Sequence, residues 1–181
     1  DEEGLPVLGD NLMSARTNIS AIYVRGAIKN NPEKTIELLS AIEDVEDTGE
    51  AFAEFDYKLN KDLVVASGNS IYLLILNGFR GLYSRLGSLY YSHPRGREIS
   101  RTYYKKLIEL AKAGQCDEAV FAVRKYGIES GKLWTISMPI RLRRRSSSTG
   151  CNVHPCKMHR EFLYILLSFR FESVNVIRKG M

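Results

Sequence analysis

The feature that most constrains the fold of this chain is a repeat of apolar residues at spacings of three and four, which continues as far as Trp134. Such spacing places apolar side chains on one face of an α-helix. Over the same residues, no segment of useful length alternates between apolar and polar positions as a half-buried strand would, although residues 63–65 are ambiguous. The repeat that predicts the first helix consists of Leu12, Ala15, Ile19, Ile22 and Tyr23.

Turn-forming residues divide this helical pattern. Residues 31–33 (Asn-Pro-Glu) are typical of a helix start, with an N-cap, a proline at the first helical position and an acid in the first turn. The second helix that they open continues through Ile42. Residues 43–50 are expected to break the chain before a third helix over about residues 51–66.

The later helices are predicted from the same signals. Residues 67–70 (Ser-Gly-Asn-Ser) supply a C-terminal glycine and a polar cap, and they open the longest helix. Its wide apolar stripe, over residues 71–89, predicts nearly complete burial. Residues 92–94 (Ser-His-Pro) start a fifth helix, and Asp117 begins a sixth that runs to about Trp134. The fold class is therefore all-α, an antiparallel bundle of six or seven helices joined by short turns.

Charge is distributed unevenly along the chain. Up to Trp134, 17 Lys and Arg face 19 Asp and Glu, whereas from Thr135 onward 9 basic residues face 2 acidic ones. A basic surplus is typical of chains that bind nucleic acid or an anionic surface. Because the helical part lacks one, its composition gives no reason to bind DNA. We divide the chain into a helical domain, residues 1–134, and an atypical basic tail, residues 135–181.

The tail contains four possible zinc ligands within nine residues: Cys151, His154, Cys156 and His159. Structural zinc sites instead join two close pairs of ligands across a loop, so the spacing argues against zinc. Two interpretations of the tail remain open. It is an unstructured segment, or it is translated from a shifted reading frame, which the other two frames of the nucleotide sequence would reveal.

The cellular compartment is inferred from features that the sequence lacks. The three cysteines have irregular spacing and form no disulfide framework, and the N-terminus has no secretory signal pattern. The longest strongly apolar run of the tail, residues 162–169, is far shorter than the ~20 residues needed to cross a bilayer. We expect a cytoplasmic protein with no membrane span.

The last predicted helix contains the most informative face of the chain. Val123, Gly127, Ser130 and Trp134 are spaced by four, three and four, so they share that face. A glycine inside a helix costs ~1 kcal/mol relative to alanine, so Gly127 and the nearby Gly131 need an explanation. Close packing of a second helix is one explanation. The other is a ligand against the backbone, with Ser130 donating a hydrogen bond and Trp134 forming a flat apolar wall.

Arg16 falls within the apolar stripe of the first helix. An arginine in such a position must meet an anion or extend to water. An internal salt bridge to Asp56 or Glu54 would satisfy it, and so would a ligand phosphate held by two guanidinium nitrogens. The residues alone leave both alternatives open.

Six blocks of the sequence carry a family resemblance: SARTNIS (14–20), AFAEFDY (51–57), ASGN (66–69), IYLLILNG (71–78), GLYSRLG (81–87) and RKYGIESG (124–131). Together with Trp134, they resemble the FadR family of fatty acid metabolism regulators, which are GntR-type transcription regulators. The resemblance is nearly continuous up to Trp134 and vanishes beyond it.

The resemblance implies an effector domain whose helical bundle encloses a cavity for long-chain fatty acyl-CoA. It further implies a homodimeric full-length protein that binds operator DNA only through an N-terminal winged helix, which this chain lacks, and that releases DNA when acyl-CoA binds. No cofactor and no membrane partner are implied. The acyl-CoA site is expected at the positions that match the family pattern: Arg16, Tyr90, Gly127, Ser130 and Trp134.

Two positions bear on how this chain differs from its relatives. Asn60 stands where the family pattern suggests phenylalanine, so the pocket wall near it is expected to be wetter or differently shaped. Related GntR effector domains hold a metal with an aspartate and three histidines. Asp56 has no such histidines in the helical part, so we expect no metal site.

Two rival functions make different demands on the sequence. An acyl-CoA-using enzyme, such as a thioesterase, would need a nucleophile with a positioned base. The helical part has one histidine, His93, at a helix start and with no serine or cysteine motif near it, so we expect no catalytic residues. A helical interaction module without a small ligand would use Gly127 and Ser130 for packing only. An apolar cavity bounded by Arg16, Gly127 and Trp134 would favour the ligand.

Overall fold

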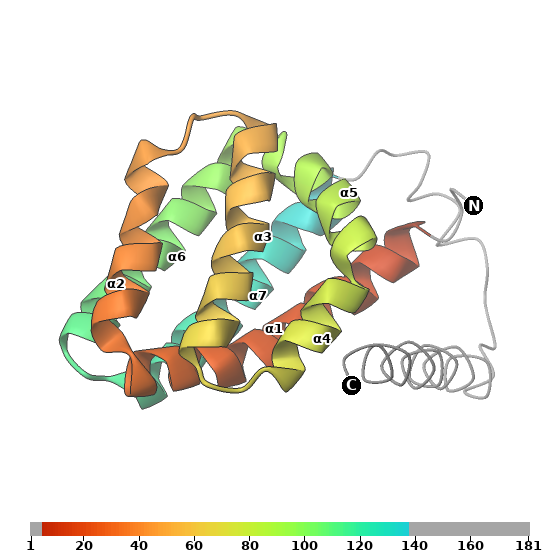
Figure 1. The fold of residues 1–181 in the computed structure, drawn as a ribbon. Coiled ribbons are helices and arrows are strands. Elements are labelled where there is room, and N and C mark those ends of the chain that lie inside the picture. The colour runs from red at the N-terminus through yellow and green to blue at the C-terminus, as the bar shows by residue number, and fades with distance from the viewer. Residues whose placement is uncertain (1–4, 138–181) are drawn as a thin grey trace, which may run out of the picture. The chain divides into compact units, whose positions relative to one another are not determined.

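The computed structural model describes residues 5–137, and within them it contains helices and no strand (Figure 1). This confirms the all-α prediction, and the seven α-helices of the described residues match the expected number. In chain order the elements are α1 (Leu5–Asn30), α2 (Pro32–Ser40), the 3-10 helix η2 (Ala41–Asp44), α3 (Gly49–Ala66), α4 (Ile71–Gly78), α5 (Arg80–Tyr91), α6 (Pro94–Lys112) and α7 (Cys116–Ser137).

The helix ends follow local chemistry. The Thr48 hydroxyl caps α3 by accepting the backbone N–H of Ala51 at 3.2 Å. At the start of α6, His93 Nδ1 accepts the N–H of Arg95 at 3.2 Å, one residue before the first-turn proline. After α3 the chain turns at Gly68, whose φ of +79° is a left-handed conformation that favours glycine. These ends confirm the predicted breaks.

α1 and α7 lie side by side and antiparallel. Thr17 lies against Gly127, and closer to the N-terminus Gly9 lies against the Trp134 ring. As the residue number falls along α1 it rises along α7, which defines the antiparallel direction. Two glycines at these contacts let the helices approach closely.

α3 is the helix that other helices surround, since it contacts α1, α2, α4, α5 and α6 (Figure 1). Its apolar residues Phe52, Leu59 and Val64 are buried, as the core of a helical bundle requires. The same helix also buries two polar residues, Asp56 and Asn60. The centre of the bundle is therefore partly polar, and that polar centre positions the candidate site.

The single long helix expected over residues 71–89 was wrong, because the chain breaks there into α4 and α5. The break lies at Phe79, whose φ of −96° and ψ of 2° are non-helical and directly follow Gly78. The expectation of nearly complete burial was wrong as well. Ile71 and Leu74 are 60% and 49% exposed, although α4 packs on α3 and α5 and its Tyr72 ring lies 6.3 Å from the Tyr23 ring of α1.

Most of the predicted face of the first helix is confirmed. Leu12 and Tyr23 are buried, and Ala15 and Ile19 are half-buried. The exception is Ile22, which is 55% exposed, whereas Ser20 and Val24 are buried, because α1 packs between α3 and α7 rather than against one neighbour. Arg16 remains on the buried side.

None of the helices between residues 5 and 137 combines the length and the apolar character needed to cross a membrane.

Candidate functional site

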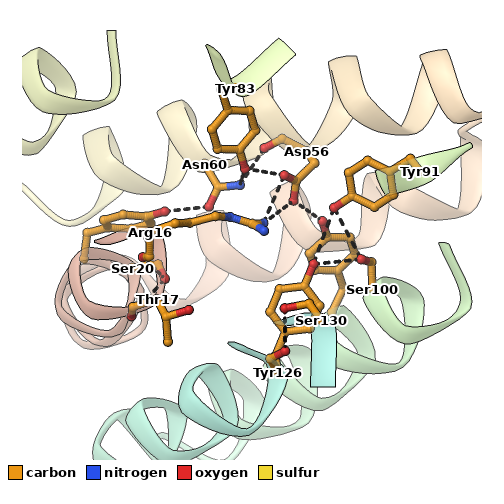
Figure 2. A network of polar contacts seen from close by, with 12 residues as sticks. Arg16, Thr17, Ser20, Asp56, Asn60, Tyr83, Tyr91, Ser100, Tyr126 and Ser130 are labelled. Atoms are coloured by element: carbon orange, nitrogen blue, oxygen red, sulfur yellow. Dashed lines mark hydrogen bonds and ion pairs between the residues drawn. The ribbon is translucent and has the colours of Figure 1, made fainter. Parts of the chain in front are cut away.

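An arginine and an aspartate form an ion pair inside the bundle. Arg16 of α1 donates from Nη2 to both carboxylate oxygens of Asp56 on α3, each at 3.0 Å (Figure 2). The side chains are 14% and 1% exposed, respectively. Of the alternatives left open for Arg16, the internal salt bridge to Asp56 is therefore present. A ligand phosphate would have to share Arg16 with this carboxylate.

Tyrosine side chains complete the surroundings of this pair. Tyr83 of α5 and Tyr104 of α6 each donate a hydroxyl hydrogen bond to the Asp56 carboxylate. The Arg16 guanidinium lies 5.4 Å from the ring centroids of Tyr83 and Tyr126, within cation–π range. Burial by itself lowers the pKa of Arg16, but Asp56 and the tyrosines raise it, and the net shift is upward. Arg16 therefore stays charged.

Asn60 extends the polar centre along α3. Its carboxamide oxygen accepts the Tyr23 hydroxyl at 2.6 Å, and its NH₂ donates to the Asp56 backbone carbonyl at 2.6 Å and to the Tyr83 hydroxyl at 3.1 Å (Figure 2). Both N–H donors and the oxygen of the amide thus have protein partners. The position where the family pattern suggests phenylalanine is a hydrogen-bonded polar wall in this chain.

A second hydrogen-bonded group connects α5, α6 and α7. The Ser100 hydroxyl lies 2.9 Å from the Tyr126 hydroxyl and donates to the Tyr91 hydroxyl at 3.3 Å (Figure 2). Tyr103 stacks on the Tyr126 ring with a centroid distance of 4.2 Å. These contacts hold the three helices around the Arg16–Asp56 pair.

A small cavity of about 30 Å³ lies beside the pair. This volume has room for a water-sized molecule, since about 10–15 Å³ is enough to hold one. Three of the five predicted site residues, Arg16, Tyr90 and Trp134, line it together. The rest of the lining is mostly apolar or aromatic and consists of Gly9, Leu12, Met13, Asp56, Tyr83, Leu86, Gly87 and Tyr91.

Gly127 does not line this cavity. It lines an open groove of about 580 Å³ between α1 and α7, together with Thr17, Arg124 and Gly131. A Cβ at Gly127 would lie 2.4 Å from Thr17 Oγ1, so close helix packing explains this glycine. For Gly131 the structure offers no such explanation, because no described atom lies within 4 Å of a Cβ there.

Ser130 is buried on the same face of α7. Its hydroxyl lies 2.8 Å from the Tyr126 carbonyl and 3.2 Å from the Gly127 carbonyl, both within its own helix. It lines a polar cavity of about 10 Å³ that Arg16 and Asn60 also line. Ser130 is therefore near Arg16, but its proton is already used by the backbone of α7.

Gly9 and Met13 are among the lining residues that the sequence did not predict. A Cβ at Gly9 would lie 2.5 Å from Trp134 Cζ2. Because a glycine inside a helix is costly, Gly9 could have been identified in α1 in the same way as Gly127 in α7. Met13 lines the apolar cavity, the polar cavity and the open groove. No sequence signal identifies it, since a methionine at helical spacing is typical of a core.

An enzyme or a metal centre would use histidine, cysteine or carboxylate side chains. His93 is exposed, and its Nδ1 accepts a backbone hydrogen bond at the start of α6. Across the described part of the chain, no three His, Cys, Asp or Glu side chains are grouped so that they could hold a metal ion. The Cys151, His154, Cys156 and His159 cluster lies outside the described residues.

Comparison with known proteins places this arrangement in a family. The sequence matches the FadR C-terminal domain family over residues 1–145 of its 181. The fatty acid metabolism regulator proteins of Shewanella sp. (strain MR-4), Shewanella amazonensis and Shewanella pealeana are 53%, 52% and 50% identical to it over 132 residues. Each alignment covers 73% of this chain but 55% of the relative, so the chain spans about half the length of these relatives. The chain belongs to the FadR C-terminal domain family.

Proposed function

We propose that this chain is the effector domain of a fatty-acid-responsive transcription regulator and that its ligand is long-chain fatty acyl-CoA. The observation that carries the proposal is the cavity beside the Arg16–Asp56 pair. Arg16, Tyr90 and Trp134 are far apart in the sequence, yet all three line that one cavity. The family resemblance selects the same three residues for acyl-CoA.

The size of the cavity determines how a ligand enters. At about 30 Å³ it is far below the roughly 300–1,000 Å³ of typical ligand pockets. The cavity is lined by residues of α1, α3, α5 and α7, so an acyl chain has to separate some of these helices to enter. A ligand that binds the separated arrangement better than the closed one shifts the population between them. This shift is the proposed regulatory signal.

The open groove between α1 and α7 is the proposed place for the CoA head group. Its volume of about 580 Å³ lies within the usual range for ligand sites. Gly127 exposes backbone to it, and Arg124 contributes a positive charge. Met13 lines both the groove and the apolar cavity, so its flexible side chain is the barrier that an entering acyl chain would displace.

Binding of operator DNA is proposed for a winged-helix domain outside the region that this chain shares with its longer relatives. The relatives are named fatty acid metabolism regulators, and the aligned region is about half of each. In the complete protein, which we propose to be a cytoplasmic homodimer, acyl-CoA binding would move α1 and α7 and change the placement of the DNA-binding domains.

Calorimetric titration with an even-numbered acyl-CoA series tests the proposal. Each buried methylene contributes ~0.8 kcal/mol, so two carbons are expected to raise affinity about fifteenfold. Affinity should therefore rise steeply from octanoyl-CoA toward palmitoyl-CoA and then level off. Asn60 is expected to lower that plateau, and Asn60→Phe to change the length at which it is reached.

Two further measurements help to interpret this titration. Trp134 is the single tryptophan of the chain, so its fluorescence should change on titration with oleoyl-CoA and stay constant with CoA alone. Release of free thiol from acyl-CoA would indicate an enzyme instead. Equal affinity for eight-carbon and sixteen-carbon chains would overturn the buried-chain proposal.

A further inference from the structure

A second open groove, of about 600 Å³, lies between α2 and α3, which run side by side (Figure 1). We call it the α2–α3 groove. It shares no lining residue with the cavity beside Arg16 and Asp56 or with the groove between α1 and α7. Its apolar lining includes Leu38 and Val65, and Val65 is 65% exposed. The proposed function therefore leaves this face of the bundle unused.

Contacts at both ends of the two helices define their relative direction. At one end, the Asn31 side chain donates to the Ala66 carbonyl at 2.7 Å. At the other end, Arg101 donates to the Ile42 carbonyl at 3.1 Å, and its guanidinium lies 4.6 Å from the centroid of the Phe52 ring. Residue numbers rise along α2 as they fall along α3, so the two helices are antiparallel.

Charged side chains form the two rims of the α2–α3 groove, Lys34 and Glu37 on α2 and Lys58 and Asp62 on α3. The antiparallel register places Lys34 across from Asp62 and Glu37 across from Lys58. Each rim is paired along its own helix, with 2.7 Å between Lys34 and Glu37 and 2.7 Å between Lys58 and Asp62. The sign of the charge therefore alternates around the four corners of the groove.

This alternation limits the kind of partner that fits. A partner of one sign, such as a nucleic acid or an acidic peptide, would be repelled at two corners as strongly as it is attracted at the other two. A second copy of this chain carries the same alternating set, and two-fold pairs are the commonest assemblies of identical chains. In such a pair, one copy is turned over onto the other.

Turning the second copy over about an axis along the groove exchanges the rims. Lys34 then meets Asp62 of the second copy, and Glu37 meets its Lys58. Turning it over about an axis across the groove exchanges the ends instead, so that Lys34 meets Glu37 and Lys58 meets Asp62. In both arrangements every corner meets a charge of opposite sign. The rim charges are thus complementary to themselves.

We infer that the α2–α3 groove is a contact surface between two copies of this domain. The inference goes beyond the proposed ligand, and it rests on the proposed function only in adding a surface to the homodimer. Exposed ion pairs contribute little individually, so the rim charges select the partner, and covering Val65 and the other apolar lining supplies affinity.

A variant with all four rim charges reversed tests the inference: Lys34→Glu, Glu37→Lys, Lys58→Asp and Asp62→Lys in one chain. It keeps an ion pair along each helix, and helical circular dichroism and the unfolding midpoint check that it folds as wild type does. In sedimentation velocity, the 181-residue wild type and this variant should each self-associate with similar affinity. A mixed pair places like charges at all four corners, so labelled wild type should bind the variant about tenfold more weakly than it binds itself.

A matched pair of single variants tests the apolar part of the contact. Val65 and Ile71 are exposed to similar extents, 65% and 60%, but only Val65 lines the α2–α3 groove. Val65→Ser should weaken self-association several-fold, because it removes apolar surface that the contact covers. Ile71→Ser should leave self-association unchanged.

A wild-type chain that stays monomeric at all concentrations would overturn the inference. So would equal affinity in mixed and unmixed pairs, which would place the contact on another surface. Loss of mixing, together with an effect of Val65→Ser and none of Ile71→Ser, supports it. Titration with palmitoyl-CoA keeps the proposed function separate. The charge-reversed variant should bind it as wild type does, and a failure of both proteins to bind would reject the ligand but not the contact.

Discussion

Asp56 carries a charge in a place where water cannot solvate it. Arg16 compensates that charge across 3.0 Å, and the Tyr83 and Tyr104 hydroxyls complete its hydrogen bonds. A buried pair of this kind contributes little when intact, because both ions lose their hydration, but removing one partner leaves an uncompensated charge. Arg16 is therefore a structural residue whatever ligand it also meets.

Arg16→Ala is expected to lower the free energy of unfolding by about 3 kcal/mol, the range for removing one partner of a buried pair. Urea denaturation measures this change. Adding Asp56→Asn should recover part of the loss, because the remaining charge is removed as well. A double variant no more stable than Arg16→Ala would show that the cation–π and packing contacts of Arg16 matter more than its charge.

The same variant tests the proposed ligand role of Arg16. If Arg16 also contacts a CoA phosphate, Arg16→Ala should weaken acyl-CoA binding by about 2 kcal/mol, and the loss should shrink in high salt. Titration of free fatty acid is the control. An equal loss for the free acid would assign Arg16 to the fold and not to the phosphate.

At the scale of the helices, the contact between α1 and α7 depends on glycine. Thr17 occupies the space that a side chain at Gly127 would need, at 2.4 Å from Oγ1 and 2.5 Å from Cγ2. Gly131, one turn further along α7, faces no described atom within 4 Å. Two glycines of one helix thus have opposite surroundings, which provides a matched pair of variants.

Gly127→Ala is expected to destabilise the domain by about 1–3 kcal/mol, because the added methyl group overpacks against Thr17. Gly131→Ala should instead stabilise it by up to ~1 kcal/mol, the difference in helix propensity. Thermal unfolding of both variants measures the contrast. Thr17→Ala, combined with Gly127→Ala, should restore part of the stability, because it removes Oγ1 and Cγ2 and leaves only the Cβ at 3.0 Å. A purely additive double variant would contradict direct contact.

At the scale of the whole molecule, the buried tyrosines make stability depend on high pH. Burial is the largest cause that raises the pKa of Tyr23, Tyr83, Tyr91 and Tyr104 above the ordinary value. The folded protein therefore keeps these phenol protons to higher pH than the unfolded chain does. Their contribution to stability is complete below about pH 10 and is lost as the pH rises toward the folded-state values.

Urea unfolding between about pH 9 and pH 11 should show this loss, with a slope of about 1.4 kcal/mol per pH unit for each buried tyrosine once the unfolded phenols ionise. Tyrosinate absorbance should increase together with loss of helical circular dichroism, since ionisation requires unfolding. Tyr104→Phe should make the slope shallower. Tyrosinate absorbance that rises fully before the helical signal changes would contradict the prediction.

The position at which the helical domain ends and the basic tail begins also concerns the whole chain. The family match stops at residue 145, and the basic surplus begins after Trp134. We expect a chain shortened to residues 1–145 to keep the unfolding midpoint and the acyl-CoA affinity of the 181-residue chain. A drop in either quantity would assign a role to the residues removed.

The sequence by itself determined the fold class and most helix boundaries, because those depend on local chemistry. Apolar spacing predicts helices, and capping residues and glycines such as Thr48 and Gly68 end or begin them without reference to distant parts of the chain. The family motifs likewise selected Arg16, Tyr90 and Trp134, which the structure brings to one cavity.

Only the tertiary structure decided where the buried side of each helix ends and which partner each polar group has. Ile22 is exposed because α1 packs between two neighbours, and the helix expected over residues 71–89 breaks at Phe79 so that α4 and α5 pack separately. Arg16 could have met Asp56, Glu54 or a phosphate, and only the packing of α1 against α3 selected Asp56.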